Sequence, residues 1–590
     1  MKVLLVAVNA KYIHSNLAVY SLKAYAEKYG KNNHKIKIKE YTINQYVEEI
    51  TADIYEEQPD MVGFSCYTLN IAHVMQIVSD LKAVREDLQI VVGGPEASYH
   101  PRQILEKHSC IDYVLCGEGE EVFRQFLDSY AEGNLQDREI DGLAYREKEV
   151  IRTNPHMQPV ELSKIPFVYQ DMKDFQNKIL YYETSRGCPF SCSYCLSSVD
   201  KKIRFRDLQL VKEELRFFIE QKVPQVKFVD RTFNCNPVRT MEIWKYIREQ
   251  DNGITNFHFE IAADLITEEE LELLSDMRPG LIQLEIGVQS VNEKTLEAIH
   301  RRTDIKKIEE VTGKIRKNHN IHQHLDLIAG LPYENYESFQ HSFDRVYAMK
   351  PDQLQLGFLK VLYGAGISEE AEKYGIVYSE RPPYEVLKTK WLSFDEVLKL
   401  KAVETVDECT FKVVEAIRKM GTVVEIYYNS LQFTHTINRL EKYFDSPFVM
   451  YQRLGTYYKE VSRGGVKHSR VNRYVLLRDF IIQELHPDGK GQRQWEELLT
   501  FDYYLRENAK SRPGFSKSLE PNKEKIRKIY TNPKLILELK GYAHFSTKQI
   551  EHMTHIEVIQ DKYILFDYQN RDVLTKAAAV TDVTEYAKIP

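Results

Sequence analysis

The sequence contains no run of apolar residues long enough to span a membrane. Its start, Met1–Asn9, has too short an apolar run for a signal peptide, and no small-residue cleavage site follows. Cysteine is scarce: there are eight in 590 residues, and five are scattered singly, namely Cys66, Cys110, Cys116, Cys235 and Cys409. Scattered thiols suit a reducing compartment. These absences predict a cytoplasmic protein that has no membrane partner.

An excess of positive charge is also absent. The net charge is −7 and the isoelectric point is about 6.3, which argues against bulk electrostatic binding to nucleic acid. The basic stretch 523–534 is interleaved with acidic Glu524, so we expect a solvated helix face there. The chain is 43% hydrophobic and 28% charged, as globular proteins are. Its length suggests roughly three to five domains.

Three of the cysteines lie within eight residues, in the CxxxCxxC spacing of Cys188, Cys192 and Cys195. Thiolates are ligands for iron–sulfur clusters, zinc or cuprous ions. Structural zinc usually takes four protein ligands, and neither a second CxxC pair nor a nearby histidine is present. Three thiolates on a four-iron cluster would leave one iron open to a substrate or cofactor. The alternatives are a zinc staple or three buried thiols.

Residues around these thiols favour a loop at the end of a strand. The run 179–184 is β-branched and aromatic, and Gly187 and Pro189 flank the first thiol. The three cysteines, with Tyr194 before the last, resemble the radical S-adenosylmethionine (radical SAM) motif. That resemblance implies a [4Fe–4S] cluster that binds S-adenosylmethionine (SAM) and cleaves it to a 5′-deoxyadenosyl radical, with Tyr194 near the adenine. The cofactor would carry the difficult chemistry, while the protein orients it and excludes water.

The first 140 residues alternate short apolar runs with helical periods, which predicts a doubly wound α/β sheet. Ligands of such sheets lie at the carboxyl ends of the strands. This region resembles the cobalamin-binding Rossmann domain found ahead of many radical SAM domains. The resemblance assigns cobalamin to residues at those strand ends: Asn9, Ser65, Tyr67, Gly93, Gly94, Glu96, Gly117, Glu118 and Gly119. The DxHxxG pattern that supplies an axial histidine is absent, since His14 has a different context, and a scaffold without cobalamin is the alternative.

Residues 141–178 contain several prolines and are expected to form a connector with one short strand or hairpin near 142–153. Residues 179–370 again alternate strands and helices, and six strand positions predict a partial (β/α)6 barrel, the radical SAM fold. Sites in such barrels lie at the carboxyl ends of the strands. By resemblance, SAM would contact the rim residues Asp230, Glu285, Gln289 and Asp326. Val-Asp-Arg at 229–231 replaces the common GGE form.

The region 371–590 is expected to be mainly helical, with a long helical stretch from Trp391 to about Glu425 and paired strands at 555–568. It resembles the uncharacterised C-terminal extension of one cobalamin-type radical SAM family. The predicted fold is therefore α/β multidomain, with a Rossmann-like cobalamin-binding domain, a radical SAM barrel and a mainly helical C-terminal region.

The resemblance predicts a cobalamin-dependent enzyme that transfers methyl groups to an unactivated centre. One alternative is a cobalamin-independent rearrangement, oxidation or sulfur insertion, and another is a non-catalytic iron–sulfur sensor or carrier. An electron donor such as flavodoxin or ferredoxin is an expected partner. If both cofactors bind, the loops after Asn9, Tyr67, Gly94 and Gly117 must face the loops of Cys192, Asp230, Glu285 and Asp326 across one cavity. Part of the C-terminal region would close the gap.

Overall fold

The computed structural model describes residues 1–133, 140–148, 150–155, 157–401, 423–461, 469–509 and 511–587. The chain forms two compact units. One holds Met1–Phe339 and Phe358–Phe394, and the other holds Gln340–Gly357 and most of the chain after Asp395. Cys409 and much of the stretch predicted to be helical up to Glu425 lie outside the described residues. Across the described residues no helix is both long and apolar enough to cross a membrane.

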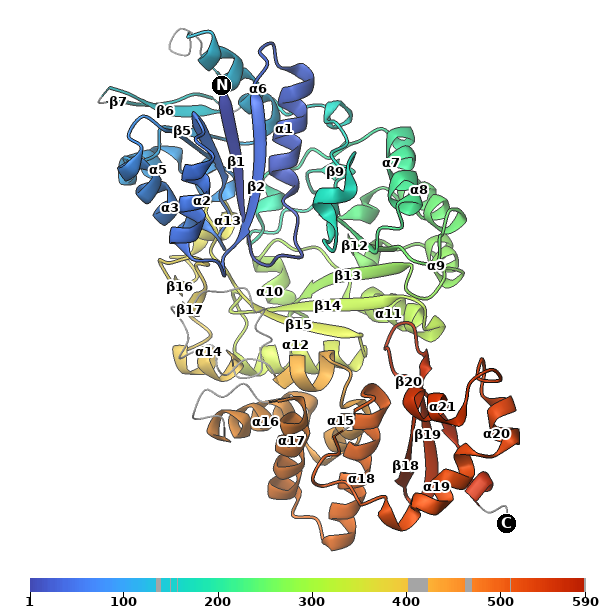
Figure 1. Ribbon diagram of the computed structural model, residues 1–590. Helices are drawn as coiled ribbons and strands as arrows, with labels where there is room; N and C mark the ends of the chain where they lie inside the picture. Colours follow the sequence, from blue (N-terminus) through green and yellow to red (C-terminus); the bar gives the residue numbers. More distant parts are fainter. Residues whose placement is uncertain are drawn as a thin grey trace. The chain divides into compact units, whose positions relative to one another are not determined.

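A seven-stranded sheet with the order β2-β1-β3-β4-β5-β6-β7 forms the N-terminal part of the first unit (Figure 1). Its strands are β1 (Lys2–Asn9), β2 (Lys35–Thr42), β3 (Met61–Ser65), β4 (Gln89–Gly93), β5 (Tyr113–Leu115), β6 (Leu143–Glu147) and β7 (Val150–Thr153). The helices are α1 (Leu17–Tyr29), α2 (Val47–Glu56), α3 (Ile71–Val84), α4 (Pro95–Ser98), α5 (Pro101–Lys107) and α6 (Gly119–Ala131).

Two apolar cores cover the two faces of this sheet, as continuous apolar strands require. Alternate residues of β1 point to opposite faces, so Leu4 and Val6 pack in one core and Val3 and Leu5 in the other. Helices α2 and α3 pack together over the first core, whereas α1 and α6 pack together over the second. The predicted doubly wound arrangement is confirmed.

The predicted hairpin near 142–153 exists, but it belongs to the N-terminal sheet and not to a free connector. Strand β6 pairs antiparallel with β5, and β7 pairs antiparallel with β6. The sheet therefore extends past residue 140 to Thr153. The hairpin continues the sheet because the backbone of β5 would otherwise be an open edge.

The radical SAM part has a six-stranded sheet in the order β15-β14-β13-β12-β11-β8. The strands are β8 (Leu180–Tyr182), β11 (Gln225–Phe228), β12 (Asn256–Ile261), β13 (Ile282–Gln289), β14 (His322–Ala329) and β15 (Gln353–Phe358), and a small pair joins β9 (Ser185–Arg186) to β10 (Arg204–Phe205). The helices are α7 (Leu208–Glu220), α8 (Pro237–Glu249), α9 (Glu268–Ser275), α10 (Glu293–Ala298), α11 (Ile305–Asn318) and α12 (Tyr336–Ala348).

Strand β13 alternates strictly between buried and partly exposed residues. Successive side chains of a strand point to opposite faces of the sheet. The buried residues of β13 face the helices, and the partly exposed ones, which include Glu285 and Gln289, face the interior of the barrel. After β15 the first unit also holds α13 (Gly366–Glu370), β16 (Val377–Tyr378) and β17 (Val386–Lys388). The predicted partial barrel with its rim at the strand ends is confirmed.

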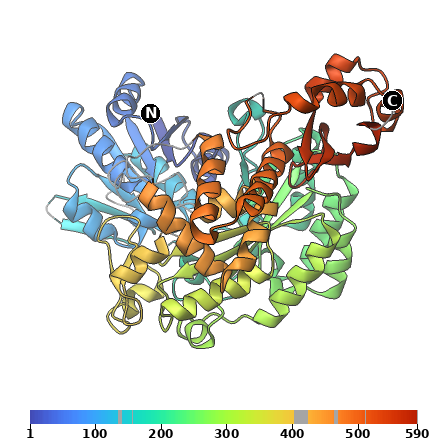
Figure 2. The same ribbon diagram turned by 90° about the horizontal axis from the view of Figure 1, so that it is seen from below.

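The second unit is mainly helical, as predicted, and ends in a small sheet (Figure 2). Strands β18 (Thr554–Ile559), β19 (Lys562–Arg571) and β20 (Ala578–Asp582) are antiparallel neighbours. The helices are α14 (Phe394–Lys401), α15 (Thr434–Leu440), α16 (Pro447–Val461), α17 (Arg470–Leu485), α18 (Gly489–Arg506), α19 (Lys523–Tyr530), α20 (Pro533–Glu538) and α21 (Thr547–Met553).

Candidate active site

The three predicted cluster ligands lie in one loop between β9 and β10. Cys188 and Cys192 are buried, Cys195 is partly buried, and no described cysteine forms a disulfide. Gly187 has a φ of +91° and packs against the carbonyl of Lys202, so the turn into the loop has no room for a side chain. Three reduced thiols in one tight loop are the donor set that an iron–sulfur cluster requires.

Asp230 anchors the start of this loop. Its carboxylate accepts hydrogen bonds from the Thr184 amide (2.9 Å), the Thr184 hydroxyl (2.6 Å) and the Ser185 hydroxyl (2.6 Å). Burial raises the pKa of Asp230 to about 6, in spite of these hydrogen bonds. The contacts make Asp230 a support of the cluster loop, and its predicted contact with SAM stays a prediction.

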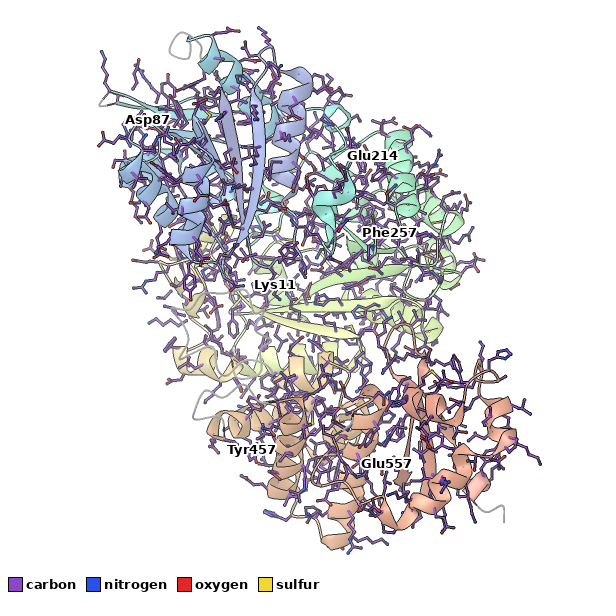
Figure 3. The ribbon with its side chains drawn as sticks, in the orientation of Figure 1. Lys11, Asp87, Glu214, Phe257, Tyr457 and Glu557 are labelled. Carbon is purple, nitrogen blue, oxygen red and sulfur yellow. The ribbon has the colours of Figure 1, made fainter. Side chains whose placement is uncertain are left out.

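The strand that leads into the loop is fixed by a buried ion pair. Arg206 donates through Nε to Glu214 (2.8 Å), a residue of α7 that Figure 3 labels. The hydroxyl of Tyr182 donates to the same carboxylate at 2.5 Å. The first strand of the barrel and the segment after the cluster loop are thus joined to one helix.

Arg301 is a site residue that the sequence reasoning missed. Its guanidinium lies 3.8 Å from the Cys192 sulfur and 3.3 Å from the Tyr194 hydroxyl, and it donates to the carbonyl of Gly287. Only a match to its spacing after the fourth barrel strand could have identified it. A fixed cation beside a thiolate stabilises negative charge on the cluster loop.

Gln289, at the end of β13, has an unusual backbone conformation and a buried oxygen without a partner in the described residues. Its φ is +73°, a left-handed conformation that is costly for a residue with a side chain. The ladder between β13 and β14 is irregular between Gly287 and Gln289. The buried Oε1 of Gln289 and the buried Nε of Arg301 have no hydrogen-bond partner in the described part of the chain. Such a strained and incompletely bonded rim beside the thiols fits a polar cofactor such as SAM.

Ionisable side chains line the inside of the barrel sheet on adjacent strands. Lys227 on β11 lies 2.9 Å from Oε2 of Glu285 on β13, and Nε2 of His258 on β12 lies 3.0 Å from the same oxygen. Burial alone would raise the pKa of Glu285, but His258 and Lys227 hold it far below its usual value. Phe257, labelled in Figure 3, is the buried neighbour of His258 on β12. The lowered pKa favours the ionised form of Glu285, and its predicted contact with SAM stays a prediction.

Asp326 on β14 lies 3.0 Å from Nε2 of His324. Burial and the charges of Glu285 and Asp326 raise the pKa of Glu260 to about 7, while Arg231 opposes this rise. Glu285, His324 and Asp326 each place a ligand atom within 4.8 Å of the others, which could hold a metal ion. Because Lys227 already neutralises Glu285, we interpret these groups as an internal charge network.

The carboxyl edge of the N-terminal sheet carries an exposed aromatic and aliphatic surface. Large side chains project from the loops after three adjacent strands, namely Tyr12 and Ile13 after β1, Tyr46 after β2 and Tyr67 after β3. Gly93 ends β4, and a Cβ there would make only ordinary contacts with Leu115. The protein itself therefore does not require glycine at this position. An apolar edge with an open backbone fits a large flat ligand such as cobalamin.

Other predicted cobalamin residues have contacts within the protein. The Asn9 amide donates to the His14 carbonyl, and the Ser65 hydroxyl accepts from Asn16. Gly94 has a φ of +97°, and a Cβ on it would lie 2.6 Å from the Cys66 carbonyl oxygen. A Cβ on Gly119 would lie 2.9 Å from Leu22. Packing explains Gly94 and the turn explains Gly117, whose φ is +78°, whereas the contact at Gly119 is with the end of a flexible side chain.

The loops after the N-terminal strands contact the barrel around β8 and the cluster loop, which is part of the predicted approach. After β1, His14 Nδ1 lies 2.7 Å from the Tyr181 hydroxyl. After β3, the Tyr67 side chain is exposed as a whole, but desolvation of its hydroxyl raises its pKa, and Ser65 and the Arg231 guanidinium oppose that rise. After β4, burial and the charge of Cys195 raise the pKa of Tyr99. Glu285 and Asp326 lie within β13 and β14, further along the barrel sheet, and their part of the predicted approach stays a prediction.

Two further contacts complete this approach. After β5, Glu118 forms ion pairs with Arg186 and Arg204 of the cluster region. The hydroxyl of Tyr384, in the region after residue 370, donates to Glu96 at 2.6 Å. One segment of the C-terminal region thus reaches the N-terminal sheet, as expected.

Three family models match consecutive parts of the chain. The B12 binding domain matches residues 3–127, the radical SAM superfamily matches residues 182–346, and a protein of unknown function, DUF4080, matches residues 372–411 and 407–580. The chain belongs to the cobalamin-binding radical SAM family. It is a radical SAM enzyme, and these domains imply a [4Fe–4S] cluster, SAM and cobalamin as its cofactors.

Several known proteins are similar to this chain. It is 25% identical over 394 residues to an uncharacterised methyltransferase of Pyrococcus horikoshii, which covers 64% of this chain and 82% of that protein. It is 25% identical over 368 residues to the cobalamin-dependent radical SAM methyltransferase TokK of Streptomyces tokunonensis, covering 57% of this chain and about half (53%) of TokK. The structure of the methyltransferase TsrM of Kitasatospora setae, with cobalamin and a [4Fe–4S] cluster bound, matches with 16% identity and a TM-score of 0.55. It covers 79% of this chain and 99% of TsrM. At that identity the structure supports the fold alone.

Proposed function

We propose that this enzyme transfers a methyl group to an unactivated carbon or phosphorus centre of its substrate in a cobalamin-dependent reaction. The observation that carries the proposal is the contact between the N-terminal strand ends and the two arginines that flank the cluster loop, in which Glu118 pairs with Arg186 and Arg204. Methyl transfer needs the methyl donor and the radical source to reach the same substrate. The names of the relatives also favour a methyltransferase.

When bound, the three cofactors would supply the radical and the methyl group. The side chains of this chain would position them. Cys188, Cys192 and Cys195 would hold the cluster, and Arg301 would stabilise its negative charge. Gln289, whose buried oxygen has no partner in the described part of the chain, would orient SAM. The segment around Tyr384 would help to exclude water from the reacting groups.

We further propose a cytoplasmic location, since seven described thiols are unpaired. A flavodoxin or ferredoxin would reduce the cluster. The alternative reaction classes, a cobalamin-independent rearrangement, oxidation or sulfur insertion, predict SAM cleavage without methyl transfer. A sensor or carrier predicts neither.

The test is anaerobic reconstitution of the protein with its cluster and hydroxocobalamin, followed by incubation with a cell extract and SAM that carries a deuterated methyl group. We expect mass spectrometry to detect a product labelled in its new methyl group. The Cys192→Ala protein is the control and should form none. Formation of 5′-deoxyadenosine by a protein that binds no hydroxocobalamin and labels no product would contradict the proposal.

A further inference from the structure

Arg186 lies two residues before the first cluster cysteine, and its guanidinium is shared by three carboxylates. Nη2 lies 2.6 Å from Glu120, Nη1 lies 3.1 Å from Glu118, and Nε lies 2.9 Å from Glu183. Glu118 and Glu120 belong to the N-terminal sheet, whereas Glu183 precedes the cluster loop. One side chain therefore joins the strand edge after β5 to the loop that holds the thiols.

A second arginine extends the same network to the far side of the loop. Arg204 pairs with Glu118 and lies 2.8 Å from Asp200. The carbonyl of Asp200 accepts a hydrogen bond from the amide of Cys188 at 3.0 Å. Arg204 is also the partner of Arg186 in the β9–β10 pair. The two arginines thus fix both sides of the cluster loop to a single acidic segment of the other domain.

The network is charged and well sheltered. Burial alone would raise the pKa of Glu120, but the Arg186 guanidinium outweighs burial and lowers it. The side chains of Arg186 and Glu120 are 16% and 6% exposed. A sheltered ion pair holds its geometry closely, because separating the charges leaves both of them desolvated.

The position of the two glutamates links this network to the cobalamin edge. Gly117 makes the turn after β5 with a φ of +78°, and Glu118 and Glu120 follow at the start of α6. They lie beside the strand edge that fits cobalamin. The resemblance assigns Glu118 to cobalamin, yet in the structure Glu118 and Glu120 pair with arginines of β9 and β10, which flank the cluster loop.

We propose that Arg186 is a positioning residue whose ion pairs with Glu118 and Glu120 couple cobalamin binding at the strand edge to the structure of the cluster loop. A ligand that orders the β5–α6 turn also orders the arginine, and the arginine orders the loop. Coupling is reciprocal, so a formed cluster must raise the affinity for cobalamin. This inference rests on the cofactors of the proposed function.

The experiment measures the dissociation constant of hydroxocobalamin by anaerobic equilibrium dialysis, with protein whose cluster has been removed by chelation and with reconstituted protein. In the wild type we expect the reconstituted form to bind at least about fivefold more tightly, a typical coupling. In Arg186→Gln and Glu120→Gln the ratio of the two constants should fall well below its wild-type value, because only the remaining Glu118 pairs still join the two segments. Arg186→Lys keeps one charge and should keep part of the difference.

The matched control is Glu121→Gln. Glu121 is on the same helix and forms its ion pair with Arg124 instead of with the cluster region. The ratio of the two constants should stay at its wild-type value in this variant. If Arg186→Gln cannot be reconstituted, Glu120→Gln tests the same contact and leaves every residue of the cluster loop unchanged.

The outcomes separate this inference from the proposed function. A wild type that binds no hydroxocobalamin overturns the proposed function. A wild type that binds it with equal constants in both forms overturns only the coupling. If the Arg186 and Glu120 variants can be reconstituted and keep the wild-type ratio of the two dissociation constants, the ion pairs are structural only and the coupling is overturned.

Discussion

The ammonium of Lys227 lies 2.9 Å from the carboxylate of Glu285, and the two residues come from strands separated by β12. The ion pair spans β12 on the interior face of the barrel, and it helps to lower the pKa of Glu285. Glu260, on the intervening strand, faces this fixed negative charge. This charge adds to burial in raising the pKa of Glu260 to about 7.

The raised pKa of Glu260 predicts a pH dependence of stability. Its folded value is about 7 against an ordinary value of 4.5. Between these values the unfolded chain loses the proton first, so a rise in pH destabilises the folded protein. We expect Glu260→Gln to become progressively more stable than the wild type from about pH 5 to about pH 7, with no further change above that. Urea denaturation at several pH values measures this difference, and a constant difference would contradict the prediction.

The cluster cysteines predict a sharp contrast between two sets of variants. Replacing Cys188, Cys192 or Cys195 by Ala removes one of three iron ligands and should abolish 5′-deoxyadenosine formation. Cys235 lies near Cys188. Burial, the charge of Asp230 and the charge of Cys188 all raise the pKa of Cys235, in that order of size. Cys235→Ala should nevertheless keep the activity. Liquid chromatography of anaerobic reactions with dithionite and SAM measures the product, and product from the triple variant would refute the assignment.

Substitutions at two neighbouring glycines should distinguish an effect on ligand binding from an effect on folding. A Cβ on Gly93 makes no close contact, so Gly93→Val should fold but bind hydroxocobalamin about tenfold more weakly, which is about 1.4 kcal/mol. A Cβ on Gly94 collides with the Cys66 carbonyl, so Gly94→Val should destabilise the domain itself. Visible absorbance and thermal denaturation measure the two effects. If Gly93→Val binds hydroxocobalamin as tightly as the wild type, the ligand does not contact the end of β4.

The hydrogen bond from Tyr384 to Glu96 predicts an effect on stability. Tyr384→Phe leaves Glu96 with the hydroxyl of Thr68 at 3.0 Å. Losing a buried bond to a carboxylate should lower the free energy of unfolding by about 1–3 kcal/mol. The control is Tyr363→Phe, because the Tyr363 ring contacts Tyr384 and is 37% exposed. Equal urea midpoints for Tyr384→Phe and the wild type would show that the bond contributes nothing.

Much of the architecture followed from local patterns. The spacing of Cys188, Cys192 and Cys195 identified the cluster loop, because three thiols within eight residues can bind one cluster without help from the rest of the fold. The strands of both sheets followed from short apolar runs bounded by turns, and the hairpin near 142–153 from its turn residues. Its membership of the N-terminal sheet did not follow, since edge pairing depends on which strand is left open.

The sequence by itself determined the order of domains, the position of the cluster loop and the strand ends, since each depends on residues close together in the chain. Tertiary structure decided the partners of the charged side chains. Arg186 and Glu120 are 66 residues apart, and Arg301 and Tyr194 are 107 apart. No local period links such residues. They meet because parallel strands bring their carboxyl ends to one edge and because burial leaves each charge only its nearest opposite charge as a partner.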